Sequence, residues 1–342
     1  MRSLATLRRL CAVALTCVVL PCATQAATQP QRCTSAFDTY RLGLAAAGVA
    51  DKHLPFMILQ PDGRTDTAVL LIHGLYESPY FLRGAAARFA AAGYNVVSLL
   101  LPGHWDAGWR SIDTVTYRDW LATADFGLDI AHCLGQHVII AGHSLGGTLA
   151  LYAALARPRD VDALVLWAPA TELRALPTLG GVIGKASGIA GNTFTRKRAD
   201  ADESARLSGN PAFQLYEMIQ YLGRTYGDAV PLDNGRRRDL PLSYVRLGAQ
   251  VRAPVFAIVP QRDPAVDERE TLSLLAQMPQ MSELIVYPEQ SAVWHANVAK
   301  SSMDTYRSQP GDYNPSFDWM MDRILAFAAR VAPANRAISA ER

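Results

Sequence analysis

Short apolar segments alternate with longer amphipathic segments through most of the chain. The apolar segments lack the in-out alternation of a half-exposed strand, so they predict strands that are covered on both faces. We predict such strands at residues 68–73, 95–100, 137–141, 163–167, 254–259 and 283–287. Between and after them the pattern predicts helices at 79–92, 116–134, 145–156, 268–277 and 317–331. This order is typical of an α/β fold, a mostly parallel sheet with helices on both faces.

The alternation breaks between Pro169 and Arg252, where the chain is glycine-rich around 180–191 and carries a mixed-charge run from Arg196 to Arg206. A helical pattern follows at 211–223. A structureless loop of this length is uncommon inside a compact domain. We therefore predict a cap inserted at residues 170–252, with the core formed by residues 27–169 and 253–342.

The N-terminus has the pattern of a signal peptide over residues 1–26. Arg8 and Arg9 precede an apolar stretch from Leu10 to Leu20, and small residues end the segment at Ala26. A retained membrane anchor is the alternative, but a spanning helix needs roughly 20 apolar residues. We expect export and a periplasmic or secreted mature protein, without a stable membrane span.

Composition and charge limit the classes of partner that we expect. The chain has 342 residues, of which 50% are hydrophobic and 19% charged, which indicates a globular protein with a sizeable core. Its formal charge is +2, and part of this comes from arginines of the leader. A near-neutral mature chain does not predict nucleic-acid binding. No residue pattern has metal-ligand spacing, so we expect neither a metal nor a cofactor; the oligomeric state stays open.

Removal of the leader would leave two of the five cysteines, Cys33 and Cys133. Two thiols in an oxidising compartment favour a disulfide. The alternative is a buried free thiol at Cys133, with Cys33 on a loose N-terminal arm.

The segment Gly142–Gly146 has the pattern G-x-S-x-G, with a predicted strand before it and a helix of small residues after it. A serine in this context sits on a strained strand-to-helix turn as an exposed nucleophile. We predict that Ser144 is a nucleophile; the alternative is a surface turn with an idle serine.

A nucleophilic serine needs a base and an acid that orients the base. His295 is the single histidine after Ser144, and it follows the last predicted strand. Asp263 directly follows another strand, which favours it because sites in open α/β sheets form at the carboxyl ends of strands. Asp267 is the runner-up, in or capping the next helix.

Two backbone N–H groups are expected to stabilise an oxyanion. One belongs to Leu145, the residue after the predicted nucleophile. The other is expected in the loop after the 68–73 strand, where Leu75 follows His73 and Gly74. We expect His73 to pack under this loop.

The chain resembles the α/β-hydrolase superfamily, and within it the carboxylesterase, monoacylglycerol lipase and serine aminopeptidase-like hydrolases. The resemblance runs from about residue 68 to 298 and rests on LLIHGLYESP, LLLPGH, VIIAGHSLGGTLAL and PVFAIVPQRDPAV. It implies an α/β-hydrolase fold with Ser144, Asp263 and His295 as catalytic triad and Leu75 and Leu145 as oxyanion hole. Trp105 and Pro260 stand where the family usually has small residues or glycine.

These features favour a serine hydrolase that cleaves a small-molecule or lipid-like carboxylic ester through an acyl-enzyme. One alternative is an exopeptidase or amidase, for which Asp200, Asp202 and Glu203 could hold a substrate amine. Another is a non-catalytic binding protein that retains the fold.

Overall fold

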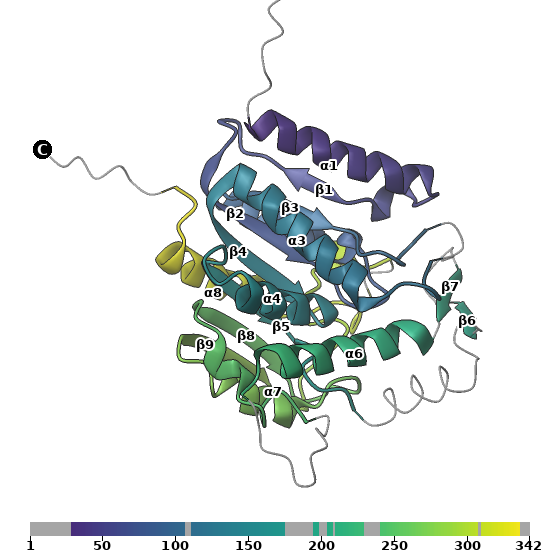
Figure 1. Ribbon diagram of the computed structural model, residues 1–342, viewed down its shortest axis with the longest axis vertical. Coiled ribbons are helices and arrows are strands. Elements are labelled where there is room, and N and C mark those ends of the chain that lie inside the picture. The colour runs from purple at the N-terminus through teal and green to yellow at the C-terminus, as the bar shows by residue number, and fades with distance from the viewer. Residues whose placement is uncertain are drawn as a thin grey trace, which may run out of the picture.

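A seven-stranded sheet with strand order β1-β3-β2-β4-β5-β8-β9 runs through the computed structural model (Figure 1). The structure describes residues 29–106, 111–174, 194–197, 204–207, 209–228, 240–306 and 309–335. β1 is antiparallel to β3, and every other pair of neighbours is parallel, which confirms the predicted sheet. The strands are β1 Phe56–Ile58, β2 Thr65–Ile72, β3 Asn95–Leu99, β4 Gly135–His143, β5 Ala163–Trp167, β8 Val255–Pro260 and β9 Met281–Tyr287.

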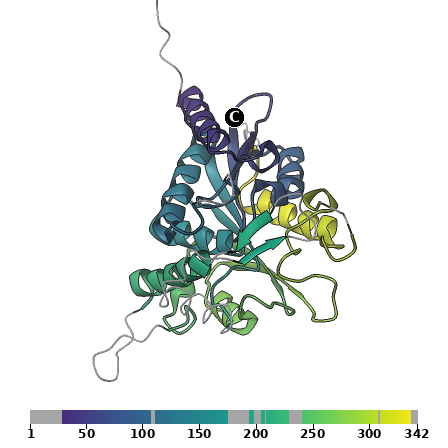
Figure 2. The same ribbon diagram turned by 90° about the vertical axis from the view of Figure 1, so that its right-hand side faces the viewer.

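Helices cover both faces of this sheet (Figures 1 and 2). Helices α1, α3, α4, α6 and α7 contribute to the core on one face, and α2 and α8 pack on the other. Their bounds are α1 Gln29–Ala46, α2 Arg83–Ala91, α3 Tyr117–Leu134, α4 Leu145–Ala156, α6 Gly209–Tyr226, α7 Glu268–Leu275 and α8 Phe317–Val331. The predicted helix at 79–92 begins instead with a 3-10 turn at Pro79–Leu82, capped by the Ser78 side chain.

The central strands show why their sequences are continuously apolar. In β2, Leu70 and Ile72 face the helices on one side, whereas Val69 and Leu71 face those on the other. Successive side chains of a strand point to opposite faces, so a strand with two covered faces buries every position. β3, β5 and β8 are buried along their whole lengths in the same way.

The segment between β5 and β8 contains a hairpin and a long helix. The hairpin pairs β6 Phe194–Lys197 with β7 Ser204–Leu207. Helix α6 buries Leu215, Met218 and Leu222 in the core that α3 and α4 share. The glycine-rich stretch and Asp200, Asp202 and Glu203 lie outside the described residues, and the cap boundaries at 170 and 252 stay a prediction.

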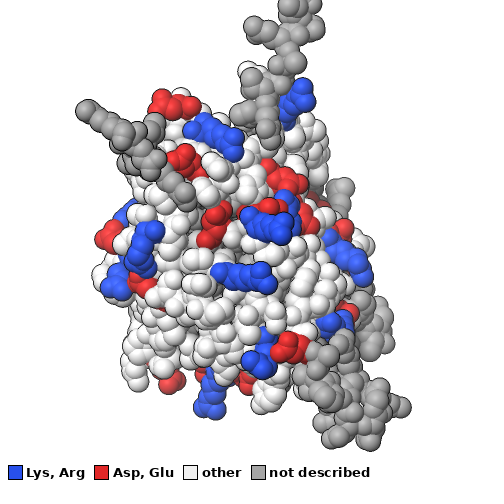
Figure 3. Space-filling model, turned by 60° about the vertical axis from the view of Figure 1, so that its left-hand side comes forward, with Lys and Arg blue, Asp and Glu red and all other residues white. Residues whose placement is uncertain are grey.

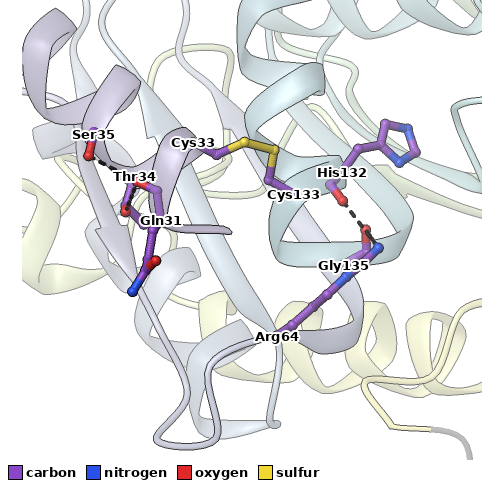
Figure 4. The surroundings of a disulfide bond; sticks show 8 residues. All are labelled: Gln31, Cys33, Thr34, Ser35, Arg64, His132, Cys133 and Gly135. Atoms are coloured by element: carbon purple, nitrogen blue, oxygen red, sulfur yellow. Dashed lines mark hydrogen bonds between the residues drawn. A yellow bond between two sulfur atoms is a disulfide. The ribbon is translucent and has the colours of Figure 1, made fainter. Parts of the chain in front are cut away.

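Helix α1 was not predicted, and it is held to α3 by a disulfide (Figure 4). Cys33 and Cys133 are bonded, with their Cα atoms 6.2 Å apart, which confirms the predicted pairing. Phe37 is buried beside it, and the Tyr40 hydroxyl donates to the Leu100 carbonyl at 2.5 Å. The N-terminal arm is therefore part of the core and not loose.

On the surface, basic and acidic side chains are interspersed on the face shown in Figure 3. Arg88 of α2 pairs with Asp318 of α8 at 2.5 Å, and Arg323 of α8 pairs with Glu283 of β9 at 2.8 Å. Among the helices that the structure describes, none has the length and apolarity needed to cross a bilayer. The predicted signal peptide lies outside the described residues.

Candidate active site

The turn from β4 into α4 places Ser144 in a strained conformation. Its φ is +52° and its ψ is −114°, a region that non-glycine residues rarely adopt. The flanking glycines are required by space, because a Cβ on Gly142 would lie 2.2 Å from the carbonyl oxygen of Gly146. A Cβ on Gly146 would lie 2.0 Å from the carbonyl oxygen of Ile72. The G-x-S-x-G pattern thus permits a turn that no larger residues would fit.

The structure brings the predicted nucleophile, base and acid together. The Ser144 Oγ lies 2.9 Å from His295 Nε2, and His295 Nδ1 lies 2.6 Å from Asp263 Oδ2. The Asp263 side chain is 3% exposed and the His295 side chain 13%. In contrast, the Asp267 side chain caps α7 by accepting from the N–H groups of Arg269 and Glu270. Asp263, and not the runner-up, therefore contacts the histidine.

Backbone and amide contacts fix both the acid and the base. The second oxygen of Asp263, Oδ1, accepts from the N–H groups of Ala265 and Val266, each at 2.9 Å. In the loop of His295, the buried Asn297 accepts from Trp294 N–H at 2.9 Å and donates to the Ala292 carbonyl at 2.9 Å. The carboxylate keeps its other oxygen free to face the imidazole, which fixes the ring orientation.

The two predicted oxyanion donors lie on turns next to the serine. Leu145 is the first residue of α4, so its N–H has no acceptor within the helix. Leu75 lies in the turn after β2, which Glu77 N–H closes by donating to the Gly74 carbonyl at 3.1 Å. His73 supports this turn: its Nδ1 donates to the Gly74 carbonyl and its Nε2 accepts from Leu101 N–H.

A buried ionic cluster beside the serine was not predicted. Glu77 Oε2 lies 2.7 Å from His143 Nδ1, and Glu77 Oε1 lies 2.9 Å from Lys300 Nζ. The other ring nitrogen of His143, Nε2, donates to the backbone carbonyl of His295 at 2.8 Å. Burial raises the pKa of Glu77, but Lys300 and His143 outweigh it and hold that pKa well below its usual value.

Comparison with known proteins shows what this chain is similar to. A family model described as serine aminopeptidase, S33, matches residues 63–221. A thermostable monoacylglycerol lipase of Bacillus sp. strain H-257 is 29% identical over 160 residues, which cover 46% of this chain and 62% of that relative. Seven strands in this order, with the serine on a strained turn after β4, add the structural evidence. The chain has the α/β-hydrolase fold.

Solved structures of lipolytic enzymes share the fold. One, from a study of LipS and LipT, two metagenome-derived lipolytic enzymes, has a TM-score of 0.59 and 17% identity, and covers 82% of this chain and 99% of that one. A monoacylglycerol lipase of Paleococcus ferrophilus has a TM-score of 0.56 and 15% identity, covering 81% of this chain and 98% of that one. At these identities the likeness supports the fold alone.

Trp105, which departs from the pattern of the resembling family, has a structural role. Trp105 has a φ of +58° and is buried, and its ring stacks on His53 with the ring centroids 3.6 Å apart. The His53 Nδ1 in turn lies 2.7 Å from the Ser78 Oγ. The bulky residue therefore joins the loop after β3 to the turn that precedes α2.

A cavity of about 630 Å³ borders Asp263. Its walls come mostly from the loops after β8 and β9, including Asp263, Arg262 and Trp294, and Arg174 from the segment after β5 completes them. Ser144 and His295 are not part of its lining, so this cavity does not define an acyl pocket. Across the described part of the chain, no group of three or more potential metal ligands is present.

Proposed function

We propose that this protein hydrolyses carboxylic esters through an acyl-enzyme on Ser144. The observation that carries the proposal is the hydrogen-bonded chain from Ser144 through His295 to Asp263, which starts at a strained turn. The match to the Bacillus monoacylglycerol lipase supports an ester as substrate, although it spans 62% of that relative's length. The activity is therefore inferred from the site and the relatives together.

The geometry fits a two-step mechanism. The Ser144 Oγ attacks the ester carbonyl carbon while its proton passes to His295 Nε2, which lies 2.9 Å away. The carbonyl oxygen becomes an oxyanion and accepts hydrogen bonds from the N–H groups of Leu75 and Leu145. When the C–O bond to the leaving group breaks, His295 returns the proton to the departing alcohol. An acyl-serine ester remains.

Water then completes the cycle. His295 Nε2 takes a proton from the water, whose oxygen attacks the acyl carbon and gives a second oxyanion. When that oxyanion collapses, the bond from the acyl carbon to Ser144 Oγ breaks, His295 returns the proton to Ser144 Oγ, and the carboxylic acid leaves. In both steps the buried Asp263 carboxylate accepts from His295 Nδ1–H. It holds the required tautomer and stabilises the imidazolium, without taking up the proton itself.

A lipid-like ester is the substrate class we propose, because the Bacillus relative is named a monoacylglycerol lipase. A peptide or amide substrate is the second candidate, since the matching family model is described as serine aminopeptidase. A non-catalytic binding role accounts poorly for three residues from distant segments in hydrogen-bond contact. The signal-peptide pattern leads us to propose that the enzyme works in the periplasm or outside the cell.

The test compares wild type, Ser144→Ala and the matched control Ser282→Ala, whose serine is exposed on β9. The substrates are p-nitrophenyl esters of increasing acyl length, a monoacylglycerol and an aminoacyl p-nitroanilide. Wild type and the control should hydrolyse the esters and be labelled by a fluorophosphonate probe. Ser144→Ala should stay unlabelled and lose several orders of magnitude in turnover. The rate enhancement that remains over the uncatalysed reaction in water should be about 10³–10⁴-fold. Equal labelling of all three proteins would remove Ser144 from the role of nucleophile.

A further inference from the structure

We propose that Glu77, His143 and Lys300 form a positioning network. It sets the base, His295, and the turn after β2 that carries Gly74 and Leu75, here called the oxyanion loop, relative to Ser144. The proposal rests on the proposed function, because it concerns how the same site is held. The three functional parts come from three separate loops, after β2, β4 and β9. The network joins all three loops through buried side chains.

The contacts form a closed ring. Glu77 Oε2 accepts from the Gly74 N–H at 3.0 Å and from His143 Nδ1 at 2.7 Å. His143 Nε2 donates to the His295 carbonyl, and Lys300, five residues further along that loop, returns to Glu77 Oε1 at 2.9 Å. The side chains of Glu77, His143 and Lys300 are 6%, 3% and 10% exposed.

The network adjoins three groups that the proposed reaction uses. Gly74 immediately precedes Leu75, a proposed oxyanion donor, and His143 immediately precedes Ser144. The carbonyl that His143 binds belongs to the base, His295, itself. A shift of any one loop would therefore change the position of the base or of the donor relative to Ser144.

Close packing leaves this arrangement little freedom. A Cβ on Gly74 would lie 2.8 Å from both Glu77 Oε2 and His143 Nδ1, so the oxyanion loop lies directly against the network. The Lys300 ammonium also lies 4.5 Å from the centre of the Phe81 ring.

Buried ion pairs are frequently no more stabilising than apolar residues of similar volume. Stability alone thus gives little reason to build this site from charged residues.

The first test uses two histidines at opposite ends of β4. His143 and His137 each place Nδ1 2.7 Å from a carboxylate oxygen, of Glu77 and of Asp162 respectively. In His143→Leu, kcat on a p-nitrophenyl ester should fall about 10- to 100-fold, because displacements near 1 Å cost that much. KM should change less than about threefold, since substrate contacts stay. His137→Leu, the matched control, should keep wild-type kcat.

The second test opens the ring elsewhere. Lys300→Met keeps the alkyl stem and removes the charge, and it should lower kcat and the rate of fluorophosphonate labelling, whereas Lys300→Arg should recover much of both. Thermal unfolding is measured for every variant, so that losses of kcat are compared among folded proteins. This arm also serves if His143→Leu does not fold.

The outcomes separate the two proposals. A wild type that neither hydrolyses esters nor takes up the probe would refute the proposed function, and the network's role with it. An active wild type whose folded His143→Leu or Lys300→Met variant keeps normal kcat and labelling would overturn the network alone. Equal losses of kcat in His137→Leu and His143→Leu would overturn it too, by showing a general effect of strand stability.

Discussion

Two buried histidines beside the oxyanion loop should make the stability of this protein fall steeply in mild acid. His73 is neutral by geometry, because its Nε2 accepts from the Leu101 N–H and so cannot carry a proton. His104 lies against it, with the ring centroids 5.0 Å apart, and its Nδ1 donates to the carbonyls of Leu101 and Pro102. Burial lowers the pKa of His73 to about 3 and that of His104 to about 4.

The sign and size of the effect follow from proton linkage. An unfolded histidine has a pKa of about 6.5, so below that pH the unfolded chain binds protons that the folded chain rejects. The free energy of unfolding is therefore at its full value above about pH 6.5. It decreases as the pH falls from there toward the folded pKa values. At pH 5, about 1.5 units below the unfolded pKa, each histidine lowers the free energy of unfolding by about 2 kcal/mol. The two together lower it by about 4 kcal/mol.

The measurement is urea unfolding of wild type and His104→Asn between pH 7.5 and pH 5. An asparagine amide can still donate toward the Leu101 or Pro102 carbonyl, but it does not titrate. The other titrating groups are common to both proteins, and His73 stays neutral at pH 5 in both because burial is the largest cause of its lowered pKa. The stability advantage of wild type over the variant should shrink by about 2 kcal/mol across this range.

The m-values of the two proteins should agree, which ensures that the same surface is exposed on unfolding. Parallel stability curves from pH 7.5 to pH 5 would refute the reasoning, because they would mean that His104 takes up its proton equally in both states.

Three further outcomes are expected. Asp263→Asn should lower ester turnover by roughly 10⁴-fold through the wrong imidazole tautomer, whereas Asp267→Asn should leave turnover nearly unchanged; steady-state kinetics would expose the opposite ranking. Replacing Cys33 and Cys133 by serine together should destabilise the protein by up to about 4.7 kcal/mol in the chain-entropy model, and urea curves that match wild type would contradict this. Gly146→Ala should abolish the folded state, as measured by circular dichroism, since the added Cβ would overlap the backbone carbonyl of Ile72. A soluble, active variant would contradict this expectation.

Much of the sheet could be predicted because the relevant information is local, and the meeting of Ser144, His295 and Asp263 because strand topology brings them to one edge. The bounds of α4, Leu145–Ala156, and β5, Ala163–Trp167, agree with the prediction because a glycine-flanked turn and a fully apolar run mark them. His295 and Asp263 follow from topology: parallel strands end at one edge, so residues after β8 and β9 meet the residue after β4 there. Positions 151 residues apart thus come within hydrogen-bond distance.

The elements that the sequence did not reveal depend on long-range partners. Strand β1 has three residues, all partly buried, and exists because it pairs with β3. Helix α1 carries no clear apolar stripe, and a disulfide, Phe37 and Tyr40 hold it to the body of the protein. Because most helical stability comes from tertiary packing, a periodicity argument has little to detect in such a helix.

The cluster of Glu77, His143 and Lys300 illustrates a limit of a different kind. The strand-end rule places all three near one edge of the sheet. Glu77 lies in the loop after β2, His143 is the last residue of β4, and Lys300 lies in the loop after β9. It does not say which charged side chains turn inward, because a glutamate or lysine in a loop is usually solvated. Only the distances of 2.7 and 2.9 Å separate a buried pair from two surface charges. Backbone topology therefore predicts which residues share an edge, whereas the hydrogen bonds that position them depend on side-chain directions that a linear pattern does not encode.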